Sequence, residues 1–200
     1  PASAPEWPGS APRCTLPPGP CRPSLRVGIG PPPAEAALFY GGRHDSARAP
    51  PLSRVVLVTG GSRGIGLATA RAFAAAGDRV AITYRSAPPD EANGLLCVPC
   101  DVTDPEQVEA AFTTIEDELG AVEILVSNAG ITHDGLLVRM GEEDFSSVVD
   151  TNLAGGYRVA KRAVTKMMRA RWGRIFFTSS VVAHLGSAGQ ANYAASKAGL

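Results

Sequence analysis

The chain has 200 residues, with 19 Lys or Arg and 19 Asp or Glu, so its formal net charge at pH 7 is zero. This balance removes any bulk electrostatic argument for a nucleic acid or membrane partner. Four cysteines are too few for a disulfide scaffold, and no apolar run approaches the ~20 residues of a membrane-spanning helix. We expect a soluble, cytoplasmic chain with one substantial core, no nucleic acid partner and no membrane insertion.

The first quarter of the chain differs in composition from the rest. Thirteen of the 17 prolines lie in residues 1–51. Proline removes backbone donors, and apolar side chains are sparse here, so the segment buries too little surface to offset the entropy of ordering. We predict that residues 1–52 form a proline-rich disordered segment and that residues 53–200 form the folded domain.

From residue 54 onward, short β-branched runs alternate with helical periods, which is typical of a parallel sheet with crossover helices. The pattern predicts a doubly wound α/β domain of the Rossmann type. Its predicted strands span residues 54–58, 79–84, 95–98, 123–127 and 174–178. The predicted helices span residues 64–76, a segment opened by the N-cap Asp104, most of residues 143–170, and a segment that begins near Asn192.

Two of these helices carry apolar stripes at spacings of three and four residues, which predict their buried faces. In the first helix the stripe comprises Ile65, Ala68, Thr69, Ala72, Phe73 and Ala76. In the second helix it comprises Val108, Ala111, Phe112, Ile115 and Leu119.

A glycine-rich segment, T-G-G-S-R-G-I-G at residues 59–66, lies directly between the first predicted strand and helix. Gly60 permits a sharp turn, Gly64 lets the backbone approach a pyrophosphate, and Gly66 lets the helix pack closely on the sheet. The free N–H groups at the helix start favour an anion. The segment predicts a dinucleotide site, with a tight connection that binds no ligand as the alternative.

The end of the second predicted strand indicates which dinucleotide is bound. An acidic residue there would bind the ribose of NAD, whereas a basic one accommodates the 2′-phosphate of NADP. Arg85 stands at this position, and Arg63 lies in the glycine loop. Two guanidinium groups favour NADP(H), although Arg85 as a solvated strand end is the alternative.

Three segments together resemble the signatures of short-chain dehydrogenases/reductases: residues 59–66, Asn128-Ala129-Gly130, and Tyr193-Ala-Ala-Ser-Lys197. Residues 128–140 and 189–200 are similar to 3-oxoacyl-[acyl-carrier-protein] reductases, and Leu125-Val126-Ser127 is similar to their actinobacterial, mycolate-pathway members. The resemblance covers residues 54–200. Because the family continues with further strands and a substrate lid, the resemblance implies a C-terminally incomplete domain, truncated after the fifth strand and the start of the next helix.

The resemblance also implies the catalytic residues. Tyr193 and Lys197, four residues apart on one helix face, would donate the proton to a ketone and hold the ribose, and an ammonium nearby favours a phenolate. Ser180 would hydrogen-bond the substrate carbonyl. Ser179 competes for that role, and strand alternation permits only one of the two. Asn152 would anchor a water relay behind Lys197.

Further positions follow from the same resemblance. Asp101 and Val102 would contact the adenine, and Asn128 would line the ribose, with a turn former at a strand end as its alternative. Arg171 would dock acyl carrier protein; the alternative is an arginine that is simply exposed to solvent at the end of a helix. The expected cofactor residues are Gly60, Ser62, Arg63, Gly64, Ile65, Gly66, Arg85, Asp101, Val102, Asn128, Ala129, Gly130, Tyr193 and Lys197.

No metal site is expected. Cys97 and Cys100 have C-x-x-C spacing, but a strand places positions three apart on opposite faces, so we interpret them as two buried thiols. His133 and His184 are predicted in loops beside the cleft without the spacing of metal ligands.

The predicted function is NADPH-dependent reduction of a 3-oxoacyl thioester, carried by acyl carrier protein, in fatty acid biosynthesis, by a homo-oligomer that is a tetramer in the family. A catalytically inactive NADP-binding fragment and a reductase of another small ketone are the alternatives. Because Leu200 follows Lys197 closely, we expect a frayed catalytic turn, an exposed fifth strand, and weak or no turnover by these 200 residues.

Overall fold

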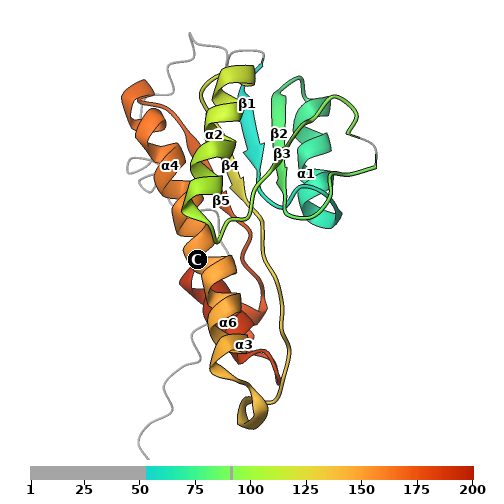
Figure 1. Cartoon of the computed structure of the whole chain (residues 1–200), viewed down its shortest axis with the longest axis vertical. Helices are drawn as coiled ribbons and strands as arrows, with labels where there is room; N and C mark the ends of the chain where they lie inside the picture. The colour runs from blue at the N-terminus through green and yellow to red at the C-terminus, as the bar shows by residue number, and fades with distance from the viewer. Residues whose placement is uncertain (1–52, 91) are drawn as a thin grey trace, which may run out of the picture. The chain divides into compact units, whose positions relative to one another are not determined.

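The computed structural model describes residues 53–90 and 92–200, so the predicted proline-rich segment, residues 1–52, lies outside the described residues. The described part contains a parallel sheet of five strands in the order β3-β2-β1-β4-β5 (Figure 1). All five predicted strands are present, with small shifts at their ends. They are β1 (Val55–Val58), β2 (Arg79–Tyr84), β3 (Leu96–Pro99), β4 (Ile124–Ser127) and β5 (Arg174–Phe177).

The helices are α1 (Gly64–Ala75), α2 (Pro105–Leu119), the 3-10 turn η2 (Leu137–Arg139), α3 (Glu142–Val149), the π-helical turn η3 (Asp150–Ala154), α4 (Gly155–Ala170), α5 (Val182–Leu185) and α6 (Ala191–Gly199). The four predicted helical segments are present in the predicted order, and two short elements, η2 and α5, were not predicted. The predicted helix over residues 143–170 is thus a continuous stretch with one π turn. Asp104 caps α2 by accepting hydrogen bonds from the backbone N–H groups of Glu106 and Gln107, as predicted.

The core lies on both faces of the central strand β1, whose side chains are at most 1% exposed. Val55 and Leu57 pack with α2 and α4, whereas Val56 and Val58 pack with α1 on the opposite face. Each such side chain contributes about 1.5–3 kcal/mol by its burial. The predicted stripe of α2 is confirmed, because Val108, Ala111, Phe112 and Ile115 are buried and Leu119 packs against them.

The predicted buried face of α1 is largely wrong. Gly66 and Ala70 are buried and Leu67 packs with them, whereas Ile65 is 70% exposed. Of the expected stripe, only Phe73 packs in this core. A helix rich in Ala and Gly has little contrast between its faces, so the close approach of Gly66 to the sheet selects which face is buried.

The sheet order reverses at β1, since β2 and β3 lie on one side of it and β4 and β5 on the other. The loops after β1 and β4 therefore leave the sheet side by side, and the backbone N–H of Thr59 donates to the carbonyl of Val126. Ligands of open α/β sheets bind outside the carboxyl ends of the strands at such a point. Among the described strands β5 is an edge, with Phe176 51% and Phe177 40% exposed, as predicted.

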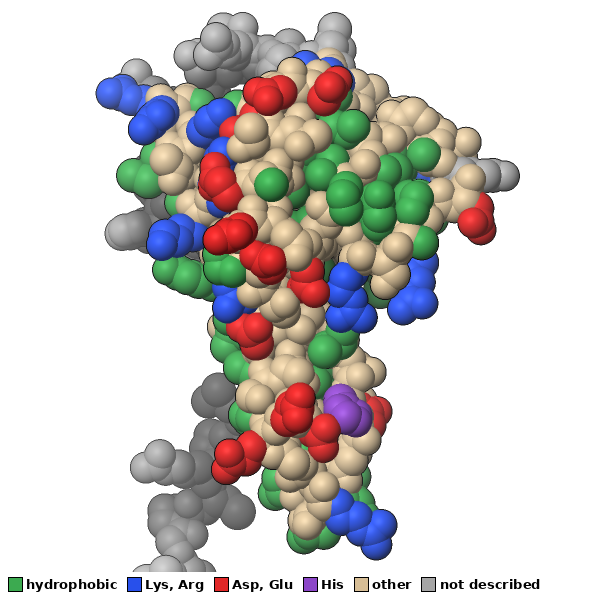
Figure 2. All heavy atoms as spheres, viewed as in Figure 1, with side chains coloured by type: hydrophobic (Ala, Val, Ile, Leu, Met, Phe, Trp, Pro, Cys, Tyr) green, Lys and Arg blue, Asp and Glu red, His purple; other side chains and the backbone are tan. Residues whose placement is uncertain are grey.

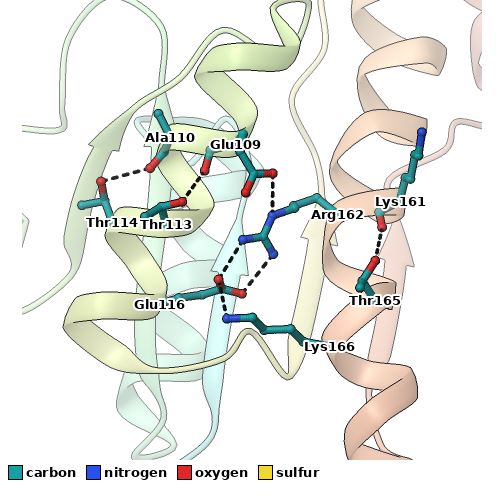
Figure 3. A network of polar contacts seen from close by, with 9 residues as sticks. All are labelled: Glu109, Ala110, Thr113, Thr114, Glu116, Lys161, Arg162, Thr165 and Lys166. Atoms are coloured by element: carbon teal, nitrogen blue, oxygen red, sulfur yellow. Dashed lines mark hydrogen bonds and ion pairs between the residues drawn. The ribbon is translucent and has the colours of Figure 1, made fainter.

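An ion-pair network joins α2 to α4 outside this crevice (Figure 3). The Glu116 carboxylate accepts hydrogen bonds from both Nη atoms of Arg162 and from Nζ of Lys166, at 2.6 to 3.1 Å. Nε of Arg162 donates to Glu109. Burial raises the pKa of the Glu116 carboxyl, but the hydrogen bonds from Arg162 and Lys166 outweigh burial and hold that pKa below its usual value.

Acidic and basic side chains are interspersed over the face of the molecule seen in Figure 2, with acidic groups along α2 beside basic groups of α4. This arrangement agrees with the zero formal net charge of the sequence. Across residues 53–90 and 92–200, none of the helices combines the length and apolar character needed to span a bilayer.

Candidate active site

The glycine loop is joined to the segment after β4 by the side chain of Thr59, which is 1% exposed. Its Oγ1 accepts hydrogen bonds from the backbone N–H groups of Asn128 and Ala129, at 3.0 and 3.1 Å. The Asn128 amide in turn donates to the carbonyls of Thr59 and Gly60. The two predicted cofactor motifs therefore form one hydrogen-bonded wall, and Thr59 is a contributor that the sequence analysis missed.

The three loop glycines to which the sequence assigns a role, Gly60, Gly64 and Gly66, have different surroundings. Gly60 has φ of +64°, and a Cβ there would lie 2.8 Å from the Cα of Ala129. A Cβ on Gly66 would meet the carbonyl of Gly60 and lie 2.5 Å from Nδ2 of Asn128. Gly64 has φ of +57° with nothing within 4 Å of such a Cβ. Gly60 and Gly66 are thus required by packing, whereas Gly64 opens the backbone to the groove.

The loop faces a groove of about 650 Å³. All the expected cofactor residues other than Tyr193 and Lys197 line this groove. The start of α1 also fits an anion, because its N-cap residue Arg63 makes no side-chain capping bond and the first turn contains no acidic residue. The residues present therefore fit the pyrophosphate of a dinucleotide.

The far end of the groove is lined by Arg85, Asp101 and Val102. The Asp101 carboxylate accepts hydrogen bonds from the backbone N–H and the hydroxyl of Thr103, which fixes the turn after β3. The segment from Ser86 to Asp90 also lines this end, and no pattern in the sequence marks it. Proline- and serine-rich loops carry no binding signal of their own, so only the fold could assign it.

Tyr193 and Lys197 line a second cavity of about 400 Å³. Arg63, Ile65, Asn128, Gly130 and Ile131 line both cavities, so the second cavity adjoins the first. Nζ of Lys197 lies 5.7 Å from the centroid of the Tyr193 ring. The phenol and the ammonium therefore lie at one end of a continuous groove that begins at the glycine loop.

Lys197 is 5% exposed, and its Nζ donates to the Thr178 carbonyl at 2.7 Å. Burial lowers the pKa of this ammonium. An ammonium has three N–H donors, so capacity remains for a ligand in the cavity. The expected fraying of the catalytic turn is wrong, because α6 continues to Gly199 and its buried polar residues hold it to the neighbouring segments.

Asn152 lies in the π turn η3 and is 1% exposed. Its amide accepts from the backbone N–H of Ile131 and donates to the carbonyl of Ile131 and to Oγ of Ser196. Ser196 in turn donates to the Tyr193 carbonyl at 2.8 Å. The side chain of Asn152 thus fixes the cavity wall and α6. Ser196 is a second contributor that was missed, although it stands inside the recognised Tyr-to-Lys motif.

The two candidate serines follow β5 rather than forming its end, so the alternation argument does not apply to them. The Ser179 hydroxyl donates to the Lys197 carbonyl at 2.8 Å. The Ser180 hydroxyl accepts from the Val182 N–H at 3.3 Å. Neither lines the second cavity, whose wall at this point is formed by Thr178. The structure therefore brings Tyr193 and Lys197 to the groove and leaves Ser180 beside it.

Other chemically notable residues lie away from this cavity. Cys97 and Cys100 pack in the cores on opposite faces of the sheet, as predicted, with Cys97 half-buried and Cys100 buried. Burial raises the pKa of Cys100 to about 11. His184 lies on α5 rather than in a loop. Nδ1 of His133 lies 3.1 Å from Asp144, and the described residues contain no cluster of three metal-ligating side chains.

The sheet is parallel and has the glycine loop at its switch point, and the Tyr–Lys pair lies in the adjoining cavity. This combination defines a dehydrogenase of the Rossmann type. The model of the short chain dehydrogenase family matches residues 54–200, and the chain belongs to that family.

Named relatives lie within the same family. The chain is 51% identical over 156 residues to 3-oxoacyl-[acyl-carrier-protein] reductase MabA of Mycobacterium tuberculosis H37Rv, covering 78% of this chain and 62% of the relative. It is 44% identical over 156 residues to 3-oxoacyl-[acyl-carrier-protein] reductase FabG of Escherichia coli K12, covering 74% of this chain and 63% of the relative. The chain thus covers less than two thirds of either relative.

Proposed function

We propose that this protein is an NADP(H)-dependent oxidoreductase that reduces a 3-oxoacyl thioester, carried by acyl carrier protein, to the 3-hydroxyacyl form in fatty acid biosynthesis. The observation that carries the proposal is the shared wall between the glycine-loop groove and the Tyr193–Lys197 cavity. The reductases named above support the substrate class, because they are 44–51% identical to this chain.

The short chain dehydrogenase family uses a nicotinamide cofactor, which supplies hydride to the carbonyl carbon when bound. In our proposal the Tyr193 hydroxyl donates the proton to the carbonyl oxygen as that oxygen gains negative charge. Lys197, beside the Tyr193 ring, favours the phenolate that this transfer leaves and binds the ribose hydroxyls. The hydrogen bond to Thr178 orients the ammonium for both tasks.

Two further residues complete the proposed site. Ser180 would bind the substrate carbonyl after a local change, since its hydroxyl now accepts from Val182. The Asn152 side chain holds the cavity wall against α6 through its hydrogen bonds with Ile131 and Ser196. The exposed C-cap residue Arg171 would dock the acidic carrier protein.

The preference for NADP(H) over NAD(H) rests on Arg63 and Arg85, which both line the groove where the 2′-phosphate would lie. We expect Arg85→Ala to weaken NADPH binding about 10- to 100-fold and to leave NADH binding within twofold, since a charge-assisted hydrogen bond contributes roughly 1.5–3 kcal/mol. Fluorescence titration with both cofactors measures this. Arg71→Ala, on the same α1 but outside the groove lining, is the control. Equal weakening for both cofactors would contradict the assignment.

Assembly and location belong to the same proposal. The exposed Tyr157, Val164 and Met168 on α4 favour a homo-oligomer, which we propose to be a tetramer in the cytoplasm. Light scattering of the purified chain measures its mass. A monomer at all concentrations would contradict self-association of these residues.

The activity is tested by following NADPH absorbance with a short 3-oxoacyl thioester and, in parallel, with the corresponding oxo ester and a simple cyclic ketone. A higher kcat/KM for the thioester supports the proposal. Equal or higher kcat/KM for the simple ketone would favour a reductase of another substrate. NADPH binding without turnover of any of them favours the binding-only alternative.

A further inference from the structure

Asn192, in the first turn of α6, is 0% exposed and uses its whole side-chain amide. Its Nδ2 donates to the carbonyl of His133 at 2.9 Å and to the carbonyl of Asp144 at 3.0 Å. Its Oδ1 accepts from the backbone N–H of Tyr193 at 2.7 Å. One side chain therefore joins α6, the loop after β4 and α3.

These contacts converge on the backbone of Tyr193. The Tyr193 N–H is one of the first N–H groups of α6, which have no partner within the helix, and the N-cap Gln190 makes no capping bond. The Tyr193 carbonyl accepts from the Ser196 hydroxyl, which is itself held by Asn152. Buried side chains thus hold Tyr193 at both its N–H and its carbonyl.

The loop that Asn192 holds is part of the cavity. Thr132, the residue before His133, lines the cavity together with Ile131 and Tyr193. The hydrogen bond from Nδ2 of Asn192 to the His133 carbonyl therefore fixes the distance between the cavity wall and the start of the helix that carries the phenol, and the bond to the Asp144 carbonyl ties both to α3. A displacement of about 1 Å from the reacting geometry can lower a rate about 10²-fold.

We infer that Asn192 is a positioning residue, which sets the Tyr193 phenol against the cavity wall at Ile131 and Thr132. The inference rests on the proposed function, since it assigns Asn192 a part in the proton transfer by Tyr193. It differs from a merely structural role in one respect: the loss of the two carbonyl contacts lowers kcat while the cofactor groove keeps its affinity.

Two variants and a control separate these roles. Asn192→Ala removes every contact of the amide. Asn192→Asp keeps the size and the acceptor for the Tyr193 N–H, but it turns a carboxylate oxygen toward the carbonyls of His133 and Asp144, where a donor is required. Gln190→Ala is the matched control, because the Gln190 amide joins the same helix start to the same loop through Asp134 on the surface.

For both Asn192 variants we expect kcat to fall about 10²-fold and KM for NADPH to stay within twofold, with Gln190→Ala within twofold of the parent in both. A kcat within threefold of the parent in Asn192→Asp would overturn the inference. So would a rise in KM for NADPH in proportion to the loss of kcat, because the substitution would then disturb the whole domain.

A second readout does not need turnover. In protein with 13Cζ-labelled tyrosine and bound NADPH, Tyr193→Phe identifies the Tyr193 signal. We expect that signal to shift or broaden in both Asn192 variants and to stay in place in Gln190→Ala, while the signal of Tyr84, which lines the cofactor groove, is unchanged in all three. An unchanged Tyr193 signal overturns the inference, whereas a parent chain without turnover overturns only the proposed function.

Discussion

The two halves of the groove are built differently. The glycine-loop half is formed by backbone at close approach, where Gly60 and Gly66 lack room for a Cβ and the Thr59 hydroxyl joins two turns. The segments that line the Tyr193 half are held by buried polar side chains behind them, since Asn152, Asn192 and Ser196 are each at most 1% exposed and fully hydrogen-bonded.

Because the two halves of the groove are built differently, different kinds of substitution should damage each half. Adding a single carbon damages the glycine-loop half, because its geometry depends on the absence of side chains. Removing a polar group damages the Tyr193 half, because each group holds another buried polar group that would lose its partner. Binding and chemistry should therefore respond to different substitutions.

The largest effect is expected at the phenol. Tyr193→Phe should lower kcat by about 10² to 10⁴-fold, because it removes the proposed proton donor and no packing atoms. NADPH affinity should remain within threefold, since the glycine-loop half is untouched. Single-turnover oxidation of NADPH and fluorescence titration measure the two quantities.

The control for this substitution is Tyr157→Phe, at an exposed tyrosine on α4. It should change neither quantity. Parallel loss of turnover and of NADPH affinity in Tyr193→Phe would show that the two halves are not separable.

An intermediate effect is expected at Gly66. A methyl group there meets the Gly60 carbonyl and the Asn128 amide, so Gly66→Ala should lower the free energy of unfolding by about 1–3 kcal/mol and weaken NADPH binding. Denaturant unfolding and cofactor titration report both losses. Gly135→Ala, where a Cβ meets nothing within 4 Å, should leave both unchanged. An unaltered NADPH affinity in Gly66→Ala would show that cofactor binding by the glycine-loop half does not depend on the absence of a side chain at residue 66.

The smallest effect is expected outside both halves, in the network of Figure 3. Because the pKa of Glu116 is lowered in the folded chain, the carboxylate stabilises the fold above its unfolded pKa of about 4.3, and this contribution is lost as the pH falls through the lower folded value. Glu116→Gln should lower the free energy of unfolding by about 1 kcal/mol at pH 7, with a smaller difference from the parent at pH 3.

Urea unfolding at the two pH values checks this expectation. The exposed Glu118, on the same helix, provides the matched control Glu118→Gln, for which no such pH-dependent difference is expected. A change in kcat or NADPH affinity in Glu116→Gln at neutral pH would contradict the expectation that the network acts on stability alone.

The parts that could be predicted from the sequence are those in which neighbours in the chain are neighbours in space. A strand, a glycine turn and a helix follow one another within residues 54–76, and the cap at Asp104 lies within four residues of its partners. The buried face of α1 could not be predicted, because its Ala- and Gly-rich surface is nearly uniform and Gly66 decides the packing.

The sequence by itself determined the order of strands and helices, the glycine loop and the shared helix face of Tyr193 and Lys197, because each depends on local spacing and on side-chain periodicity. Only the tertiary structure decided that Asn192 joins three segments, that Lys197 is buried against Thr178, and that Ser180 stands beside the cavity rather than in its wall. Those contacts join residues far apart in the chain, and their partners are mostly backbone carbonyls and N–H groups. Every residue type carries such groups, so no sequence pattern marks them.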